Sequence, residues 1–156
     1  MANKEYYKES DLMVSIDEME AMEIDELFDD AVTYFNTGHS ETMFTSFYMF
    51  QKVIEKNPNY LAKGSGDSAY FYLGLIYYNN LNDLDVAIEN FSKATELDPT
   101  DGYSFVNRGY CWSDKGEFEK ALADLKIAKL YNGDEFDPDI DLKIQNVEKH
   151  ISKKSI

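Results

Sequence analysis

The stretch YFYLGLIYYNNLNDLDVAIENFSKATELDP, residues 70–99, decides the fold because a second stretch repeats its pattern. The second copy is FVNRGYCWSDKGEFEKALADLKIAKLYNG, residues 105–133. Gly74 aligns with Gly109 at an offset of 35, and the alanines of the second halves align at an offset of 34. A turn between the two halves absorbs the difference of one residue. Self-similarity at this period predicts an array of like supersecondary units.

Apolar and small residues recur at helical spacing inside the first copy. Tyr70, Leu73 and Tyr77 fall on one face of a first helix. Gly74 and Ala87 are small, so the two helices of a pair can approach closely. A proline then ends the second helix. This spacing resembles the tetratricopeptide repeat, a helix–turn–helix unit of about 34 residues.

The resemblance covers about residues 23–151 and implies an all-α fold, a short right-handed α-solenoid of antiparallel helix pairs. A weaker first copy has Ala31 in place of the glycine and Ser46 in place of the alanine. A terminal helix with Ile140, Ile144 and Val147 on one face is expected to cap the array, with Asp137 as its N-cap and Pro138 at its first position. The expected boundaries are an acidic segment at 1–22, partly mobile or forming a short helix, repeats at about 24–58, 67–101 and 102–135, a capping helix at about 138–151, and a tail at 152–156.

Composition limits the class of function. The chain has 156 residues and a formal net charge of −15, which argues against binding to nucleic acid or to anionic membranes. A single cysteine excludes a disulfide framework and disfavours a thiolate zinc site. No run of about 18 apolar residues occurs, so a cytoplasmic location is expected.

The negative charge is concentrated near the N-terminus. Residues 1–50 hold two lysines against twelve carboxylates, a net charge of −10, and DEMEAMEIDELFDD at residues 17–30 carries most of it. Ser15 and Glu18 have the spacing of a capping box, which predicts a short helix here. The acidic run has two interpretations: an interaction segment, or a solvated helix face that suits the helix dipole.

The residues that could carry chemistry do not form a catalytic pattern, so no enzymatic activity is expected. His39 and His150 have no nucleophile near them in the expected fold, and Cys111 falls within a packed helix as a buried thiol. The aspartates at residues 137–141 lack the glycine of a calcium loop and fall at a helix start. We therefore expect neither a metal site nor a cofactor.

Arg108 is the only arginine of the chain and stands where the preceding copy has Leu73. The resemblance implies that such an arginine reaches an acid on the second helix of its own repeat, and Asp124 is the matching residue. The first interpretation is a structural ion pair between them. The alternative is that Arg108 grips a carboxylate of a partner, because the guanidinium fork serves either role.

The resemblance also implies a concave groove, lined by the first helices of successive repeats, that holds an extended peptide or a partner helix. Aromatic rings there are not needed for packing between the paired helices, and such rings are typical of interfaces. In the alternative, the N-terminal segment fills part of the groove and some rings belong to the core. A carboxylate clamp of the kind that binds chaperone tails is absent. The predicted groove residues are Phe71, Tyr72, Leu75, Tyr78, Tyr103, Asn107 and Tyr110, with Phe28, Val32 and Phe35 in the first repeat.

These observations favour a non-catalytic protein–protein interaction module that binds a peptide or partner helix in an aromatic concave groove. The acidic rim of that groove suits an apolar segment with basic flanks. The alternative is a small acidic cytoplasmic inhibitor, such as an immunity protein or antitoxin, that covers a basic toxin surface. A homodimer is compatible with either function.

Overall fold

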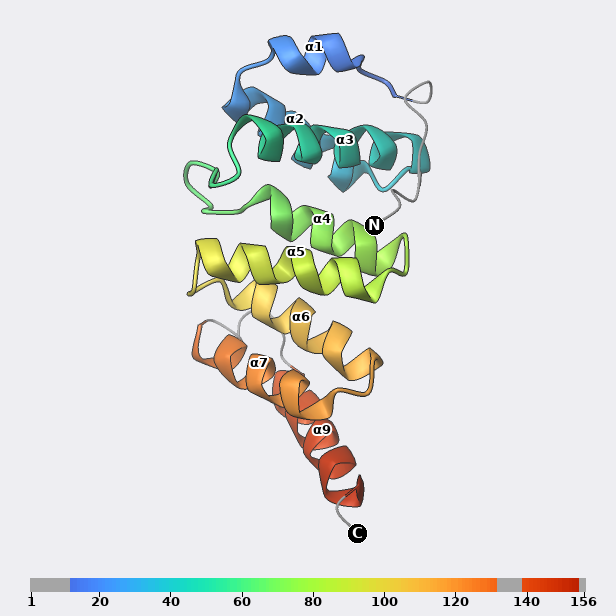
Figure 1. The fold of residues 1–156 in the computed structure, drawn as a ribbon, viewed down its shortest axis with the longest axis vertical. Coiled ribbons are helices and arrows are strands. Elements are labelled where there is room, and N and C mark those ends of the chain that lie inside the picture. Colours follow the sequence, from blue (N-terminus) through green and yellow to red (C-terminus); the bar gives the residue numbers. More distant parts are fainter. Residues whose placement is uncertain (1–11, 132–138, 155–156) are drawn as a thin grey trace. The chain divides into compact units, whose positions relative to one another are not determined.

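The computed structural model describes residues 12–131 and 139–154, and within these ranges the chain forms helices and no strand (Figure 1). The prediction of an all-α fold is therefore confirmed. Contacts divide the chain into two units, residues 1–81 and 82–156. The helices are α1 (Ile16–Ala21), α2 (Ile24–Thr37), α3 (Ser40–Lys56), α4 (Ala69–Asn79), α5 (Leu84–Leu97), α6 (Gly102–Asp114), α7 (Phe118–Leu130) and α9 (Ile140–Lys154).

In the first unit, α2 packs against α3, and α3 packs against α4. Gly38 ends α2 with a positive φ of 72°, a conformation that glycine adopts without strain, so the chain can turn back into α3. The core is dense in aromatic and sulfur-containing side chains. Its buried members include Met19, Leu27, Phe28, Ala31, Met43, Phe47, Met49, Phe50, Val53, Leu73 and Ile76.

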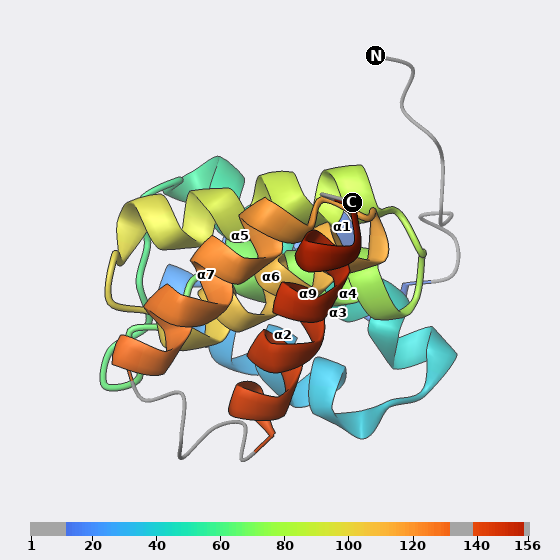
Figure 2. The same cartoon turned by 90° about the horizontal axis from the view of Figure 1, so that it is seen from below.

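In the second unit, α6 packs closely against α7, and α5 packs against α6. A Cβ at Gly109 would lie 3.1 Å from Cγ of Leu125, so the glycine permits the close approach that the sequence predicts. α9 packs against α7 (Figure 2) and buries Ile140, Ile144 and Val147. This apolar face is the one expected for a capping helix.

Local signals for the helix ends agree with the structure where it describes them. Ser15 and Glu18 form the predicted capping box, with the Glu18 N–H donating to Oγ of Ser15 at 3.2 Å and the Ser15 N–H donating to Oε2 of Glu18 at 2.8 Å. The expected cap at Asp137 and Pro138 lies outside the described residues, and the repeat boundaries stay a prediction. Among the described helices, none has both the length and the apolar character that a membrane crossing needs.

Candidate partner-binding site

Helix α4 carries four of the seven predicted groove residues and contains no charged side chain. Ser68 caps it, because its Oγ accepts the N–H of Phe71 at 3.2 Å. One side of the helix is buried, and Phe71, Leu75 and Tyr78 on other sides are half-buried. A helix that is apolar all round is normally enclosed by protein. This one leaves apolar and aromatic surface within reach of solvent.

The fourth α4 residue, Tyr72, is part of the core of its unit. Its ring stacks on Phe50 with centroids 4.8 Å apart, and it meets Phe28 and Phe35 edge-on at 5.8 Å and 5.3 Å. The hydroxyl donates to Oδ2 of Asp67 at 3.3 Å, and burial, together with this carboxylate, raises the pKa of Tyr72. The ring thus packs on the preceding helix α3, as the alternative interpretation of the rings allowed. Its role toward a partner protein stays a prediction.

Phe28 also departs from the expectation for the first repeat. The side chain is 2% exposed and lies 5.7 Å from Phe50 and 5.4 Å from Tyr60, measured between ring centroids. It is a core residue, as the alternative interpretation of the rings allowed. Val32 and Phe35 are half-buried and pack against the same core.

Helix α6 carries the other three predicted residues, in the second unit. Tyr103 is 45% exposed, and its backbone oxygen accepts the side-chain amide of Asn107 at 2.8 Å. Tyr110 is half-buried because Lys143 of α9 lies over it, with Nζ 2.5 Å from the hydroxyl and 4.3 Å from the ring centroid. Of the three, Tyr103 presents the most aromatic surface to solvent.

The structure brings Arg108 and Asp124 together. Nε of Arg108 donates to Oδ2 of Asp124 at 2.7 Å and Nη2 donates to Oδ1 at 2.8 Å, which is the bidentate geometry. Nη1 donates to Oγ of Ser92 at 3.1 Å and to Oγ1 of Thr95 at 3.0 Å, and the guanidinium lies 5.2 Å from the centroid of Phe105. The network links α5, α6 and α7. The hydroxyl partners Ser92 and Thr95 were not predicted from the sequence. The one sequence feature that could have indicated them is their separation by three residues on the helix that precedes Arg108.

This geometry bears on the alternative role of Arg108. Asp124 is 6% exposed, and the Arg108 side chain is 17% exposed. All three nitrogens of the guanidinium already donate within the unit. A partner's carboxylate would have to displace an internal acid from a site that solvent barely reaches. The structure thus favours the internal pairing.

The acidic run at residues 17–30 lies in α1 and in the first half of α2. Its carboxylates at Glu23, Glu26, Asp29 and Asp30 are exposed. Asp25 instead accepts the hydroxyl of Tyr60 at 2.8 Å and pairs with Lys63, and these two partners lower the pKa of Asp25. Most of the carboxylates on α2 therefore face solvent.

The groups that could support catalysis or bind a metal are dispersed. In residues 12–131 and 139–154 there is no group of three or more His, Cys, Asp and Glu side chains that could hold a metal ion. His150 stacks on Phe118 with ring centroids 4.7 Å apart. Cys111 is fully buried, and burial raises the pKa of its thiol to about 12, so the thiolate is scarce near neutral pH.

Comparison with known proteins agrees with this architecture. A family model described as tetratricopeptide repeat matches residues 68–101. The first tetratricopeptide domain of Spaghetti (RPAP3), bound to the HSP90 peptide SRMEEVD, is 14% identical with a TM-score of 0.68, over 83% of this chain and 93% of that one. The translocator chaperone SycD of Yersinia enterocolitica is 20% identical with a TM-score of 0.67, over 90% and 94%. SycD in complex with a peptide of the translocator YopD is 18% identical with a TM-score of 0.65, over 92% and 99%.

The class of protein follows from the fold and the repeat together. Residues 68–101 are a tetratricopeptide repeat, and the fold of the chain is that of tetratricopeptide domains. The helices follow the order expected for three repeats and a terminal capping helix.

Proposed function

We propose that this chain is a non-catalytic protein–protein interaction module, which binds a peptide or partner helix against the first helices of its repeats. The observation that carries the proposal is α4, an uncharged helix inside the recognised repeat that keeps apolar and aromatic side chains half-exposed. Large aromatic surfaces that solvent can reach are typical of interfaces, because rings bury a large area at a low cost in entropy. Tyr103 on α6 adds a second surface of this kind.

Two of the structural relatives support a peptide as the ligand. The Spaghetti domain is bound to an HSP90 peptide and SycD to a peptide of YopD. Both share only the fold with this chain, so the chemistry of the ligand here must follow from this chain's own side chains.

Those side chains disfavour an acidic ligand such as SRMEEVD. Helices α2 and α4 contain no lysine or arginine, and the single cation of α6 is Arg108, which Asp124 already binds. A carboxylate-rich peptide would therefore meet no available cation on any one of these helices. The exposed acids of α2 favour an apolar segment with basic flanks instead. A cytoplasmic location is part of the same proposal.

One observation favours the second candidate, an acidic inhibitor of a basic toxin. The N-cap and the exposed face of α2 carry four exposed carboxylates, Glu23, Glu26, Asp29 and Asp30. Residues 12–81 contain three lysines, and each contacts another group. Lys52 and Lys56 of α3 bind Glu20 of α1, and Lys63 pairs with Asp25. The exposed carboxylates on this face are therefore left strongly negative. Complementary charge would speed association with a basic protein and make the affinity sensitive to salt.

The two candidates differ in which substitutions weaken binding. With a partner captured by the full chain and purified, the dissociation constant is measured for the wild type, for Leu75→Ala with Tyr78→Ala, and for Tyr103→Ala. The matched control combines Glu26→Gln, Asp29→Asn and Asp30→Asn. Tyr72 is left unchanged, since replacing it would damage the core.

The interaction module predicts that at least one aromatic variant weakens binding by about tenfold or more, as expected for central interface residues. The acid-neutralised control should then mainly slow association and reduce the salt dependence. If the acid-neutralised control loses affinity and the aromatic variants do not, the inhibitor is the better description of the function. Affinity that survives every one of these changes would contradict both candidates.

A further inference from the structure

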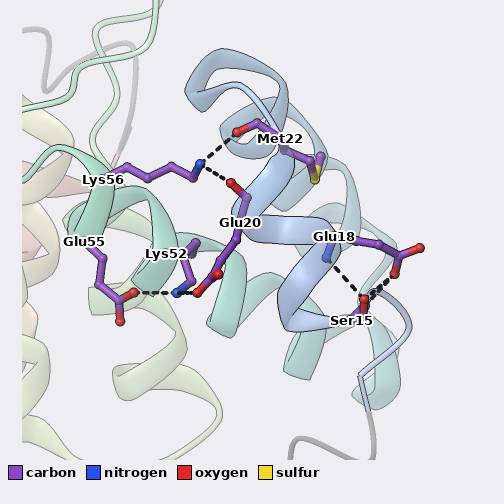
Figure 3. A network of polar contacts seen from close by, with 7 residues as sticks. All are labelled: Ser15, Glu18, Glu20, Met22, Lys52, Glu55 and Lys56. Atoms are coloured by element: carbon purple, nitrogen blue, oxygen red, sulfur yellow. Dashed lines mark hydrogen bonds and ion pairs between the residues drawn. The ribbon is translucent and has the colours of Figure 1, made fainter.

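Helix α1 is held in place by α3 and cannot be stable alone, because it has only six residues. Figure 3 shows Lys52 and Lys56 of α3 extending toward α1. The Met19 side chain is fully buried in the core of the first unit. Just before the helix, the Met13 N–H donates to Oγ1 of the buried Thr45 at 3.0 Å.

The polar contacts between the two helices use the charge of both lysines. Nζ of Lys56 donates to the backbone oxygens of Glu20 and Met22 at 2.8 Å and 2.9 Å, where the last carbonyls of α1 lack partners within the helix. Nζ of Lys52 donates to Oε1 of Glu20 at 3.2 Å and to Oε2 of Glu55 at 2.7 Å. The α3 surface thus recognises a carboxylate and the C-terminal end of a short helix.

The packing beneath α1 is rich in methionine and has a cavity at its side. A cavity of about 300 Å³ lies beside the contact. Met43 and Met49 belong to the same buried cluster as Met19, and Met22 packs against that cluster. Methionine side chains are flexible and accommodate different partners. The residues that line the cavity are Ile16, Met19, Tyr48, Gln51, Lys52 and Glu55.

We propose that this surface of α3, formed by Tyr48, Gln51, Lys52, Glu55 and Lys56, is a second docking site, which α1 occupies in the absence of a partner. The partner would be an acidic amphipathic segment, because the resident helix shows which chemistry the surface accepts. That helix and its C-cap place apolar side chains at steps of three residues, at Ile16, Met19 and Met22, and the helix places a carboxylate at Glu20. The proposal does not depend on the aromatic faces of α4 and α6, which lie on other helices and favour a basic ligand.

The test displaces α1 in the full chain and offers its sequence back as a peptide. Met19→Asp would place a charge in a buried apolar position, so α1 should leave the surface. Hydrogen exchange monitors the amides of α1 and α3 in this variant. The probe is a fluorescent peptide of residues 12–23, LMVSIDEMEAME, and its binding is followed by anisotropy. A control peptide carries the Met19→Asp change itself.

The proposal predicts fast exchange in α1 and continued protection in α3 of the Met19→Asp chain. The peptide should bind this chain at least tenfold more tightly than it binds the wild type, in which α1 competes. The control peptide, and a chain that also carries Lys52→Glu and Lys56→Glu, should lose at least tenfold in affinity.

Each other outcome overturns the proposal. Loss of protection in α3 of the Met19→Asp chain would show that α1 is an integral part of the fold. Unchanged protection in α1 would show that the helix is not displaced. Equal affinity for the wild type and the Met19→Asp chain, or no binding to either, would show that the α3 surface is no docking site. Binding that tolerates the two lysine changes would show that Lys52 and Lys56 do not select an acidic partner, which contradicts the proposal.

Discussion

Replacing Asp124 with alanine should destabilise the second unit by about 2–3 kcal/mol. Loss of one partner of a buried ion pair typically costs about 3–5 kcal/mol, because the remaining charge stays buried without compensation. Here the Arg108 side chain is 17% exposed and keeps its bonds to Ser92 and Thr95, which places the effect below that range. For a chain of this size, about 1 kcal/mol changes Tm by about 2–4 °C, so Tm should fall by about 4–12 °C.

The assay is unfolding in urea, followed by circular dichroism, with the free energy of unfolding extrapolated to water. Lys93→Ala is the matched control, since it removes an ion pair with Glu96 whose side chains are 51% and 64% exposed. Exposed pairs contribute little, so this control should lose less than about 0.5 kcal/mol. The double variant Arg108→Met with Asp124→Leu should regain at least half of the loss, because it leaves no unpaired buried charge.

Two results would refute the reasoning about this pair. A loss of a few tenths of a kcal/mol in Asp124→Ala, similar to that in Lys93→Ala, would mean that the pair contributes no more than a surface contact. A double variant no more stable than Asp124→Ala would mean that the loss does not come from an unpaired charge.

Three further predictions concern single positions. A Cβ at Gly102 would lie 2.1 Å from the backbone oxygen of Tyr131 at the end of α7, so Gly102→Ala should lower the free energy of unfolding by about 1–3 kcal/mol. A loss under about 0.5 kcal/mol in urea unfolding would contradict this prediction. The Cys111 thiol, with its pKa raised to about 12 by burial, should react with a thiol reagent at pH 8 only after denaturant is added, and rapid native labelling would contradict its burial. Burial and the hydrogen bond to Asp25 raise the pKa of Tyr60 to about 12, above the ordinary value of about 10, so the stabilising effect of Tyr60 is complete below pH 10 and is lost between pH 10 and 12. The free energy of unfolding, measured across this range, should depend less on pH in Tyr60→Phe than in the wild type.

The sequence predicted those features of the fold that depend on spacing along one chain. The closeness of α6 and α7 follows from a small residue at Gly109, and the pairing of Arg108 with Asp124 follows from their positions within one repeat. The capping box of α1 follows from Ser15 and Glu18, three residues apart. Each of these interactions joins residues of one helix or of one helix pair, where spacing along the chain sets which side chains meet.

The sequence could not predict which aromatic rings would be buried. Tyr72 falls on the expected groove side of its helix, yet it stacks on Phe50 from the preceding repeat. Phe28 is buried among the same rings. Residues 57–68, which link α3 to α4, contribute to this arrangement, because Tyr60 from that link also packs on Phe28. A repeat pattern specifies the pairing within a unit but gives no information about an irregular connection.

The charge distribution of the first unit implies that its two proposed surfaces select opposite ligands. The exposed acids of α2 leave a negative face, which favours a basic segment at the aromatic helix α4 of the same unit. The lysines of α3 are directed at α1, and they would become available only if α1 left. Raising the salt concentration should therefore weaken the binding of a basic ligand. It should also weaken the contact between α1 and α3, because both interactions depend on opposite charges. Neutralising Glu26, Asp29 and Asp30 separates the two effects, since it weakens only the first.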